Sequence, residues 1–540
     1  MTTTTDFIIR TEDIRPEEIL GLFVSVKRDR ELVDKLKGTI PVIVEGSRGT
    51  GKSLLLRVCE QEQLREFEQS RVFPVYVSFV RSSLLNSADQ SQFQHWMLAR
   101  LCARITRALS QSGYDVSSSS ASKLLIGDDQ KLGASKTKLE KLAEEFEETY
   151  KNPGFMIGIE GLPSVEAFKE AVEDICRDFN IRRLNILFDE AAHIFRPEQQ
   201  RQFFTLFRDL RSPYMTCNAA VYPGVTSYGD SFEESHDAQI ESLQRDINDS
   251  DYLQHMRDIV FKQADSKLQT EIVRAGNNFA ALAYAVSGNP RLLLKTISLA
   301  GSLRTNDVER VLKEFFRTTI WSEHSGLAER YPGHKELIDW GRTFVEGIVA
   351  QDTNRKNEDW RKEGKTERTC FIWVHRDAPQ AAKEGLRLLM YTGIVARLDS
   401  GVVATRREIG TRYAINIGCL AADTSSPITY INDLRKGLSI KRFTEYGANH
   451  SAFADISQKV GKLVEFDVSA ILQKLLEQSV EVLDLSNHQE GALKSIGIDT
   501  VGKALKSTEA DFMKAAYIGP KRSRKIMNTT TAAVLEYLSG

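Results

Sequence analysis

The chain has 540 residues and a formal net charge of −2, and 41% of its residues are hydrophobic and 27% charged. This length exceeds what one hydrophobic core supports, so we expect several domains, and the near-neutral charge means that any contact with nucleic acid must come from local patches. No uncharged apolar run reaches about 18 residues, no signal-type segment follows Met1 and the six cysteines form no C-x-x-C pair, so we expect a cytoplasmic protein without a membrane span.

The first 250 residues alternate between strand and helix patterns. Residues 1–38 are predicted to form an arm ending in a helix. Four strands are predicted at 39–46 ("TIPVIVEG"), Val72–Val80, Arg183–Glu190 and 214–224 ("YMTCNAAVYPG"), with a helix at about 90–112. The stretch of about 113–160 is predicted as an insertion, with a serine-rich surface loop and one exposed, charged helix. Strands that alternate with helices indicate a parallel sheet covered on both faces, so residues 39–250 are predicted to form an α/β core.

A glycine-rich segment follows the first predicted strand. The stretch Gly46-Ser-Arg-Gly-Thr-Gly-Lys-Ser53 fits the phosphate-binding pattern G-x-x-x-x-G-K-[ST] at every fixed position, and a leucine-rich helix follows it. We expect Lys52 to reach the β- and γ-phosphates of ATP and the Ser53 hydroxyl to bind Mg²⁺, while backbone N–H groups surround the phosphates. The alternative is a glycine turn without a ligand. The residues predicted to bind the nucleotide are Gly46, Ser47, Arg48, Gly49, Thr50, Gly51, Lys52, Ser53 and Leu54.

Two carboxylates end the third predicted strand, "LNILFDE". We expect Asp189 to hold Mg²⁺ through its water shell and Glu190 to act as the general base that polarises the attacking water. The alternative is an ordinary strand end followed by an acidic helix cap.

These two motifs together resemble the AAA+ superfamily, its origin-recognition-like branch and the related signal-transduction ATPases with numerous domains, over about residues 20–310. The resemblance implies a polar "sensor 1" residue after the fourth strand, with Thr226 as the first candidate and Tyr222 or Asn218 behind it. It also implies a "sensor 2" arginine in a helical lid, which the segment "SGNPRLLLK" places at Arg291; the alternative there is a capped helix N-terminus. The residues predicted to be catalytic are Glu190, Lys52, Arg291 and Thr226.

The chain departs from the AAA+ pattern in one respect. AAA+ rings carry an arginine finger between the fourth and fifth strands, but residues 212–244 contain no Lys or Arg. A homo-oligomer is therefore left open, and a slow, switch-like ATPase is at least as well supported as a processive motor.

The patterns after residue 250 predict a helical lid (251–335), a further domain (336–430) and a linker (431–466), with a hinge or helix edge in the charge run 353–368. The segment "EGLRLLMYTGIVARLDSGVVATRREIGTRYAIN" has a helix and two strands joined at "DSG", and it resembles a winged-helix domain. Winged helices bind DNA in some proteins and serve as packing modules in others. The candidate DNA contacts are Lys383 and Arg387 on the helix and Arg406, Arg407 and Arg412 on the wing.

Residues 467–540 carry the segments "VLDLS", "LKSIGIDTVGKAL" and "YIGPKRSRKI", which resemble the C-terminal domain of the RNA polymerase α subunit and other helix-hairpin-helix units. Glycines at the hairpins, Gly497 and Gly502 at the first and Gly519 at the second, would let a helix N-terminus approach the DNA backbone closely. Four cations follow at a helix start, where they oppose the helix dipole and are better explained by contact with phosphates. The alternative is the solvated basic face of a protein-binding module. These cations are Lys521, Arg522, Arg524 and Lys525.

The predicted architecture is an α/β P-loop NTPase core with a parallel, AAA+-like sheet, an α-helical lid, a winged-helix domain and a small all-α helix-hairpin-helix domain. The predicted function is an ATP- and Mg²⁺-dependent switch that couples nucleotide state to DNA binding. One alternative is a signalling ATPase of a bacterial antiphage or mobile-element system, acting in antiviral defence, whose C-terminal domain recruits a protein effector. Another is a chain that binds ATP as a structural element.

Overall fold

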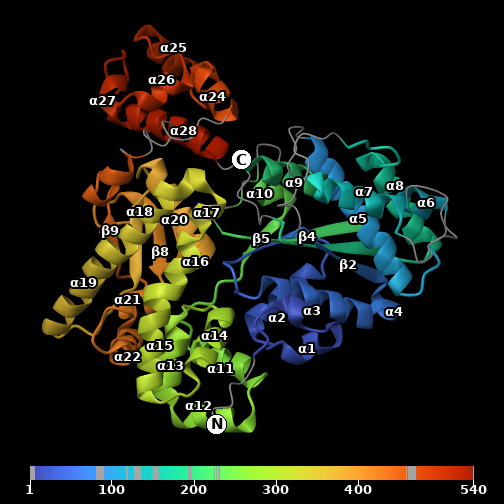
Figure 1. The fold of residues 1–540 in the computed structure, drawn as a ribbon, viewed down its shortest axis with the longest axis horizontal. Helices are drawn as coiled ribbons and strands as arrows, with labels where there is room; N and C mark the ends of the chain where they lie inside the picture. Colours follow the sequence, from blue (N-terminus) through green and yellow to red (C-terminus); the bar gives the residue numbers. More distant parts are fainter. Residues whose placement is uncertain are drawn as a thin grey trace. The chain divides into compact units, whose positions relative to one another are not determined.

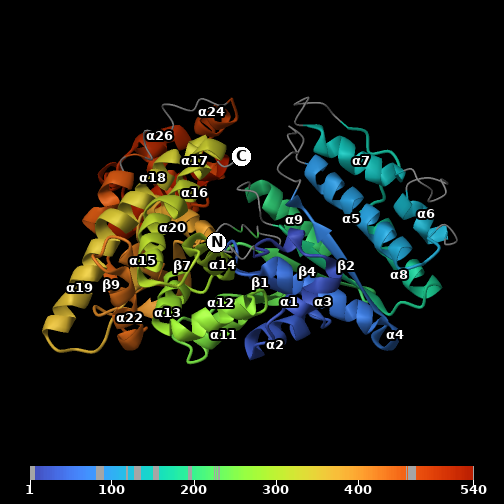
Figure 2. The ribbon, with the colours of Figure 1, turned by 60° about the horizontal axis from the view of Figure 1, so that its bottom comes forward.

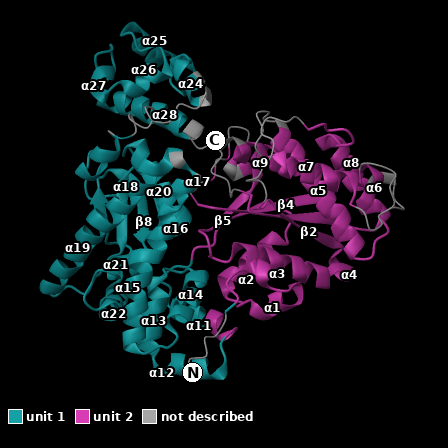
Figure 3. Cartoon of the chain, in the orientation of Figure 1, with its two compact units in different colours: residues 1–7, 245–257, 264–540 teal, residues 8–244, 258–263 magenta. Residues whose placement is uncertain are grey.

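The structure (Figure 1) is a computed structural model, and it describes residues 7–80, 91–116, 120–126, 136–149, 157–191, 197–223, 226, 228, 232–457, 459 and 470–538. The chain divides into two compact units (Figure 3). The unit that we call the N-terminal unit contains residues 8–244 and 258–263. The C-terminal unit contains residues 1–7, 245–257 and 264–540.

A five-stranded parallel sheet lies at the centre of the N-terminal unit. Its strands are β1 (Val42–Glu45), β2 (Val72–Ser78), β3 (Arg183–Asp189), β4 (Met215–Val221) and β5 (Gln239–Ser242), in the order β2-β3-β4-β1-β5. All neighbouring strands run parallel. The first four strands are almost wholly buried, as expected for a sheet covered on both faces. The predicted parallel α/β core is confirmed; β5 was missed because "QIES" has no apolar run.

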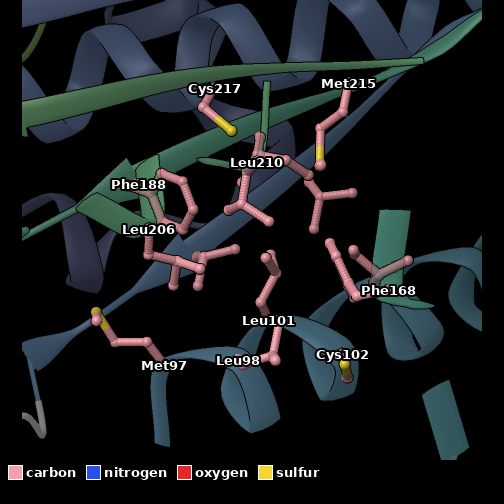
Figure 4. Close-up of a cluster of buried hydrophobic side chains, with 14 of the residues drawn as sticks. Met97, Leu98, Leu101, Cys102, Phe168, Phe188, Leu206, Leu210, Met215 and Cys217 are labelled. Atoms are coloured by element: carbon pink, nitrogen blue, oxygen red, sulfur yellow. The ribbon is translucent and has the colours of Figure 1, made fainter. Parts of the chain in front are cut away.

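Helices cover both faces of this sheet (Figures 1 and 2). On one face, the helices α1 (Ile19–Leu22), α2 (Lys27–Leu36) and α3 (Lys52–Arg65) share a buried cluster with the strands. On the other face, α5 (Ser91–Gln111), α8 (Val165–Asp178) and α9 (Pro197–Asp209) share a larger cluster. Figure 4 shows Leu101, Phe168 and Phe188 of that cluster meeting between helices and strands. The short helices α4 (Phe67–Ser70) and α10 (Glu234–Asp237) complete this unit together with α6 and α7.

The two helices described between α5 and α8 are part of the core of this unit. The helix α6 (Ser120–Ile126) packs against α5 and α8, and α7 (Lys138–Glu147) packs against α5. A capping box between Thr137 and Glu140 begins α7, and Leu139, Leu142 and Phe146 are buried beneath it. The prediction of an exposed helix was therefore wrong, because the leucines at helical spacing face a partner helix. The serine-rich stretch is helical from Ser120 onward.

A series of helices follows the first sheet, and they lie in the C-terminal unit except for residues 258–261 at the end of the first of them. These are α11 (Tyr252–Phe261), α12 (Ser266–Arg274), α13 (Gly276–Ala285), α14 (Pro290–Ala300), α15 (Thr305–Glu314), α16 (Ile320–Ser325) and α17 (Leu327–Arg330). Apolar faces hold them together: α13 and α14 bury most of their alanines and leucines. A lid at 251–335 remains a prediction that these helices support.

A second sheet follows, with strands in the order β7-β8-β6-β9. The strands are β6 (Phe371–His375), β7 (Val395–Val403), β8 (Ile409–Ile415) and β9 (Thr444–Tyr446), where β7 and β6 are antiparallel to β8, and β9 is parallel to β6. The helices around the sheet are α18 (Lys335–Thr343), α19 (Ala350–Lys362), α20 (Gln380–Thr392), α21 (Ile417–Ala421) and α22 (Pro427–Gly437).

Two expectations for this region were wrong. The strand β7 runs through "DSG" with shifts in its register, so the turn to β8 lies at residues 404–408 instead. The charge run at 353–368 contains the end of the helix α19 at Lys362, as the helix-edge alternative expects. The expected linker at 431–466 begins too early, because residues 427–437 form α22 and Thr444–Tyr446 pairs with β6.

The end of the chain is a small group of helices. These are α24 (Ala470–Glu477), α25 (Asn487–Ser495), α26 (Val501–Lys506), α27 (Glu509–Phe512) and α28 (Pro520–Leu538). Side-chain caps begin three of them, from Ser486, Thr500 and Thr508. The helix α28 packs against α24, α26 and α27, and it also packs against α20.

Among the described residues, no helix has the length and apolar character needed to cross a membrane. All six cysteines are free and buried.

Candidate functional site

The glycine-rich segment forms a loop between β1 and α3, as the phosphate-binding pattern requires. Gly51 has a φ of 105° directly before α3, a conformation that L side chains rarely adopt. At Gly46, an added Cβ would lie 2.6 Å from Thr50 Oγ1 and 3.3 Å from Lys52 Cγ. The loop therefore needs glycine for backbone conformation at one position and for close approach at the other.

Lys52 lies at the centre of this loop. Its buried ammonium group donates hydrogen bonds to the carbonyl oxygens of Gly46 at 2.5 Å and Ser47 at 3.1 Å. It also lies 4.0 Å from the centroid of the Tyr222 ring, which attracts a cation through its negative face. Lys52 is thus held at the inner surface of the loop, where phosphate oxygens would compete with the carbonyls for its protons.

The other predicted nucleotide-binding residues surround Lys52 in the loop and the first turn of α3. Thr50 is buried and donates to the Ser47 carbonyl oxygen at 2.9 Å, which tightens the loop. Ser53 and Leu54 are half-buried in the first turn of α3, and Arg48 is exposed at the loop tip. The Ser53 hydroxyl is therefore presented at a helix N-terminus, where anions are favoured.

Asp189 is the last residue of β3 and is 2% exposed. Its Oδ1 atom accepts the backbone N–H of Glu190 at 2.9 Å, and its Oδ2 atom accepts the hydroxyl of Tyr76 at 2.5 Å. Tyr76 was not predicted, because a tyrosine inside an apolar strand gives no signal of its own.

Glu190 follows Asp189 in a left-handed conformation, with a φ of 60°. Burial, together with the neighbouring Asp189 charge and opposed by Lys52, raises the pKa of Glu190 to about 7. A carboxylate with a pKa near neutrality is suited to accept a proton from water.

The donor set of this site fits a hydrated magnesium ion. Mg²⁺ prefers hydroxyl, carboxylate, phosphate and water oxygens, and it keeps several of its waters. Ser53 and Asp189 offer one hydroxyl and one carboxylate. In the part of the chain that the structure describes, no cluster of three or more His, Cys, Asp or Glu side chains could hold a metal alone. A metal at this site would therefore need phosphate oxygens as additional ligands.

The three sensor 1 candidates have different surroundings. Asn218 is fully buried in β4, where its side chain accepts from Val42 N at 2.8 Å and donates to Leu36 O at 3.1 Å. These contacts hold α2 against the sheet, so Asn218 is a structural residue. Tyr222 contacts Lys52, and the Thr226 hydroxyl donates to the Tyr222 carbonyl oxygen at 2.8 Å. Of the three candidates, Tyr222 is therefore the one whose side chain lies against Lys52.

Arg291 is the second residue of α14 and is half-buried. Asn289 caps this helix by accepting the Leu292 N–H at 3.2 Å, and the preceding Gly288 donates its N–H to the hydroxyl of Tyr252 at 2.8 Å. These bonds fix the start of α14. Lys52 belongs to the N-terminal unit and Arg291 to the C-terminal unit, so a bridge between them through a triphosphate stays a prediction.

The candidate DNA contacts in the second sheet divide into exposed and engaged cations. Arg406 and Arg407 are exposed in the turn between β7 and β8. Arg412 instead donates to Ile440 O at 2.6 Å and pairs with Asp399 at 2.5 Å. On α20, Arg387 pairs with Glu384 at 2.5 Å, and burial lowers the pKa of Lys383. Of these five cations, only Arg406 and Arg407 therefore have the exposed, uncompensated charge that a contact with phosphates requires.

The cations at the start of α28 divide in the same way. Lys521, Arg522 and Lys525 are exposed, although Arg522 also donates to Tyr517 O at 2.6 Å. Gly519 directly precedes Pro520, the first residue of the helix. Gly497 lies after the end of α25, with a φ of 80° that favours glycine in the turn towards α26. We call the three exposed cations the α28 cation group.

Arg524 differs from the α28 cation group, because its guanidinium is engaged within the protein. Its guanidinium pairs with Glu509 and donates to Asp377 O at 3.2 Å, Ala448 O at 3.1 Å and Asn449 Oδ1 at 2.8 Å. It is 17% exposed. Nearby, Asn528 Oδ1 accepts the N–H of Gln380 at 2.9 Å, at the start of α20. Arg524 therefore attaches the terminal helices to the second sheet, and its charge is already compensated.

Comparison with known proteins gives matches to parts of the chain. The family model ORC-CDC6-like matches residues 8–271. A stretch of 56 residues is 41% identical to the α subunit of DNA-directed RNA polymerase from Carboxydothermus hydrogenoformans. That match covers 10% of this chain and 18% of the polymerase subunit.

Three solved structures are similar to the chain at low identity. The Aeropyrum pernix ORC1 protein in complex with DNA is 16% identical, with a TM-score of 0.32, over 78% of this chain and 93% of that one. The A. pernix ORC2 protein in its ADPNP–ADP complexes is 11% identical, with a TM-score of 0.36, over 76% and 94%. Drosophila ORC bound to DNA is 13% identical, with a TM-score of 0.30, over 80% and 95%. At such TM-scores, these likenesses carry no argument about function.

The family match spans β1 to β5 and thus the whole parallel sheet with its glycine-rich loop and its Asp189–Glu190 pair. Residues 8–271, a little under half of the chain, therefore match the ORC-CDC6-like family model, and this stretch contains the whole candidate nucleotide site.

Proposed function

We propose that this chain is a magnesium-dependent AAA+ ATPase whose nucleotide state controls its grip on DNA. Two features carry the proposal. In the N-terminal unit, a phosphate-binding loop around Lys52 occurs together with the buried Asp189–Glu190 pair. In the C-terminal unit, a group of exposed cations lies at a helix N-terminus.

The proposed roles at the nucleotide follow from the local contacts. Lys52 exchanges its bonds to the Gly46 and Ser47 carbonyl oxygens for bonds to phosphate oxygens. Ser53 and Asp189 hold Mg²⁺, which supplies neutralisation of phosphate charge. Glu190 accepts the proton of the attacking water, because its raised pKa makes it a sufficient base near neutral pH. Tyr222 detects whether Lys52 has moved, since its ring lies against that ammonium group.

The proposed DNA contact is made by the α28 cation group. These side chains surround the first turn of α28, whose unpaired N–H groups and partial positive charge also favour phosphate. Lys521, Arg522 and Lys525 are exposed, whereas Arg524 is engaged in the protein. Contacts of this kind bind the backbone of the duplex and give little sequence specificity. Arg406 and Arg407 are a second proposed contact with phosphates.

The test measures binding of a labelled duplex and hydrolysis of ATP by the same full-length preparation. The proposal expects Mg²⁺-dependent hydrolysis and duplex binding that weakens steeply with salt. An absence of duplex binding at low salt, with ATP, with ADP and without nucleotide, would refute the DNA role while leaving the ATPase role intact.

A second candidate function is a signalling ATPase whose terminal helices recruit a protein effector. It is favoured by apolar side chains that the terminal helices expose: Tyr517 is 83% exposed, Val482 53% and Met513 42%. Replacement of these three residues by serine distinguishes the two candidates. If the terminal helices recruit a protein effector, the triple variant should no longer bind that effector. If they bind DNA, the salt dependence of duplex binding should be the same in the variant and in the wild type.

A further inference from the structure

Tyr76 connects β2 to the metal-binding carboxylate that ends β3. Its hydroxyl donates to Asp189 Oδ2 at 2.5 Å, while the other carboxylate oxygen accepts the Glu190 N–H at 2.9 Å. Each oxygen of Asp189 thus has one fixed donor, and these two bonds set the rotation of the carboxylate plane. A carboxylate oxygen accepts more than one hydrogen bond, so both oxygens can still accept from metal-bound water.

The strand register makes this contact possible. β2 and β3 are parallel neighbours in which Tyr76 lies beside Leu187 and Ser78 lies beside Asp189. Tyr76 belongs to the buried cluster on the α3 side of the sheet, whereas Val75 and Val77 belong to the opposite cluster. Its hydroxyl therefore reaches the carboxylate on the same face as α3, the helix that begins with Lys52 and Ser53.

The ring of Tyr76 is itself held in place. The Arg57 guanidinium, from α3, lies 3.5 Å from the ring centroid and is anchored to Glu60 at 2.8 Å. Arg104, from α5, donates to the Tyr76 carbonyl oxygen at 3.2 Å. With the side chain 7% exposed, the phenol has no access to bulk water that would replace its bond to Asp189.

We propose that Tyr76 is a positioning residue that aims the Asp189 carboxylate at a hydrated magnesium ion, and that Arg57 fixes the ring in the orientation this requires. This inference rests on the proposed magnesium-dependent ATPase function. Hydrogen bonds to a metal-binding carboxylate fix its orientation, and their removal typically weakens metal binding or activity roughly 10- to 100-fold. Tyr76 itself touches neither the nucleotide nor the metal in this role.

The experiment compares the Mg²⁺ concentration that half-saturates binding of a fluorescent ATP analogue in the full chain and in Tyr76→Phe. Phenylalanine keeps the ring and its contact with Arg57, and it removes only the hydroxyl. We expect the half-saturating Mg²⁺ concentration to rise roughly 10-fold or more, while binding of the analogue in excess EDTA is unchanged. Arg57→Gln is expected to shift the same quantity in the same direction by a smaller factor.

The chain offers a matched control in Tyr446, a fully buried tyrosine of the second sheet whose hydroxyl donates to Asp352 Oδ2 at 3.2 Å. Tyr446→Phe removes a tyrosine–aspartate hydrogen bond without changing the Mg²⁺ dependence. Thermal unfolding of all variants identifies any loss of folded protein, which would weaken binding in Mg²⁺ and in EDTA alike. An unchanged half-saturating Mg²⁺ concentration in folded Tyr76→Phe would overturn the inference. A wild-type chain that binds the analogue without any Mg²⁺ dependence would instead refute the proposed function on which the inference rests.

Discussion

Neutralising the α28 cation group tests the DNA contact quantitatively. Lys521, Arg522 and Lys525 are exposed, so their replacement by glutamine removes three charges without breaking an internal ion pair. Each phosphate neutralised by a protein cation contributes about −0.9 to the slope of log K against log salt, so the triple variant should have a slope shallower by about 2.7. Between 50 and 200 mM salt, this corresponds to a roughly 40-fold smaller loss of affinity than in the wild type. Fluorescence anisotropy of a labelled duplex at several salt concentrations measures both slopes.

The same group of helices supplies a control with equal charge change. Lys494, Lys503 and Lys514 are each paired with a carboxylate, namely Glu481, Asp499 and Asp511. Their replacement by glutamine should leave the salt slope close to that of the wild type. Equal slopes in the wild type and the α28 variant, or an equal decrease in both triple variants, would refute the assignment of this surface.

Three further outcomes are expected. Glu190→Gln should reduce hydrolysis by roughly 100- to 10,000-fold while ATP binding persists. The wild-type rate of hydrolysis should rise with pH through about 7, because Glu190 must lose its proton to act as a base. A rate that is flat from pH 5.5 to 8.5 would contradict this role. The folded-state pKa of Glu190 lies above its ordinary value of 4.5, so ionisation of Glu190 destabilises the fold as the pH rises from 4.5 to 7. In chemical unfolding at pH 8, Glu190→Gln should therefore be more stable than the wild type by at most about 3 kcal/mol. Near pH 4, the two proteins should have the same free energy of unfolding. Arg524→Ala should lower the free energy of unfolding by about 1–3 kcal/mol, because Glu509 and the Asp377 and Ala448 carbonyl oxygens lose their donor, and it should leave the salt slope of duplex binding unchanged.

The nucleotide site was predictable where its residues are contiguous in sequence. The loop from Gly46 to Ser53 and the pair Asp189–Glu190 each follow an apolar strand, and strand ends of a parallel sheet meet at one edge. The parallel core and its first four strands followed from the same apolar runs. The sequence could not indicate Tyr76, because its partner Asp189 is 113 residues away and the contact depends on which strands are neighbours.

The same limit explains what the sequence did not indicate elsewhere in the chain. Arg524 lies in a basic run that is typical of a DNA contact, but its partners Asp377 and Asn449 are 147 and 75 residues distant. The strand β9 is three residues long and is defined by its pairing with β6, so no local periodicity reveals it. α7 has an amphipathic pattern that predicts a helix, but only the packed fold shows that its apolar side faces α5.

In the proposed switch, bound ATP and bound DNA affect each other's affinity. The most direct measurement is the dissociation constant of a duplex for Glu190→Gln, which cannot readily hydrolyse ATP, with saturating ATP and without nucleotide. A coupled switch predicts a difference of at least about fivefold, and it predicts that DNA changes the affinity for ATP by the same factor. Equal duplex affinities in the two states, in a protein that demonstrably binds ATP, would contradict the account.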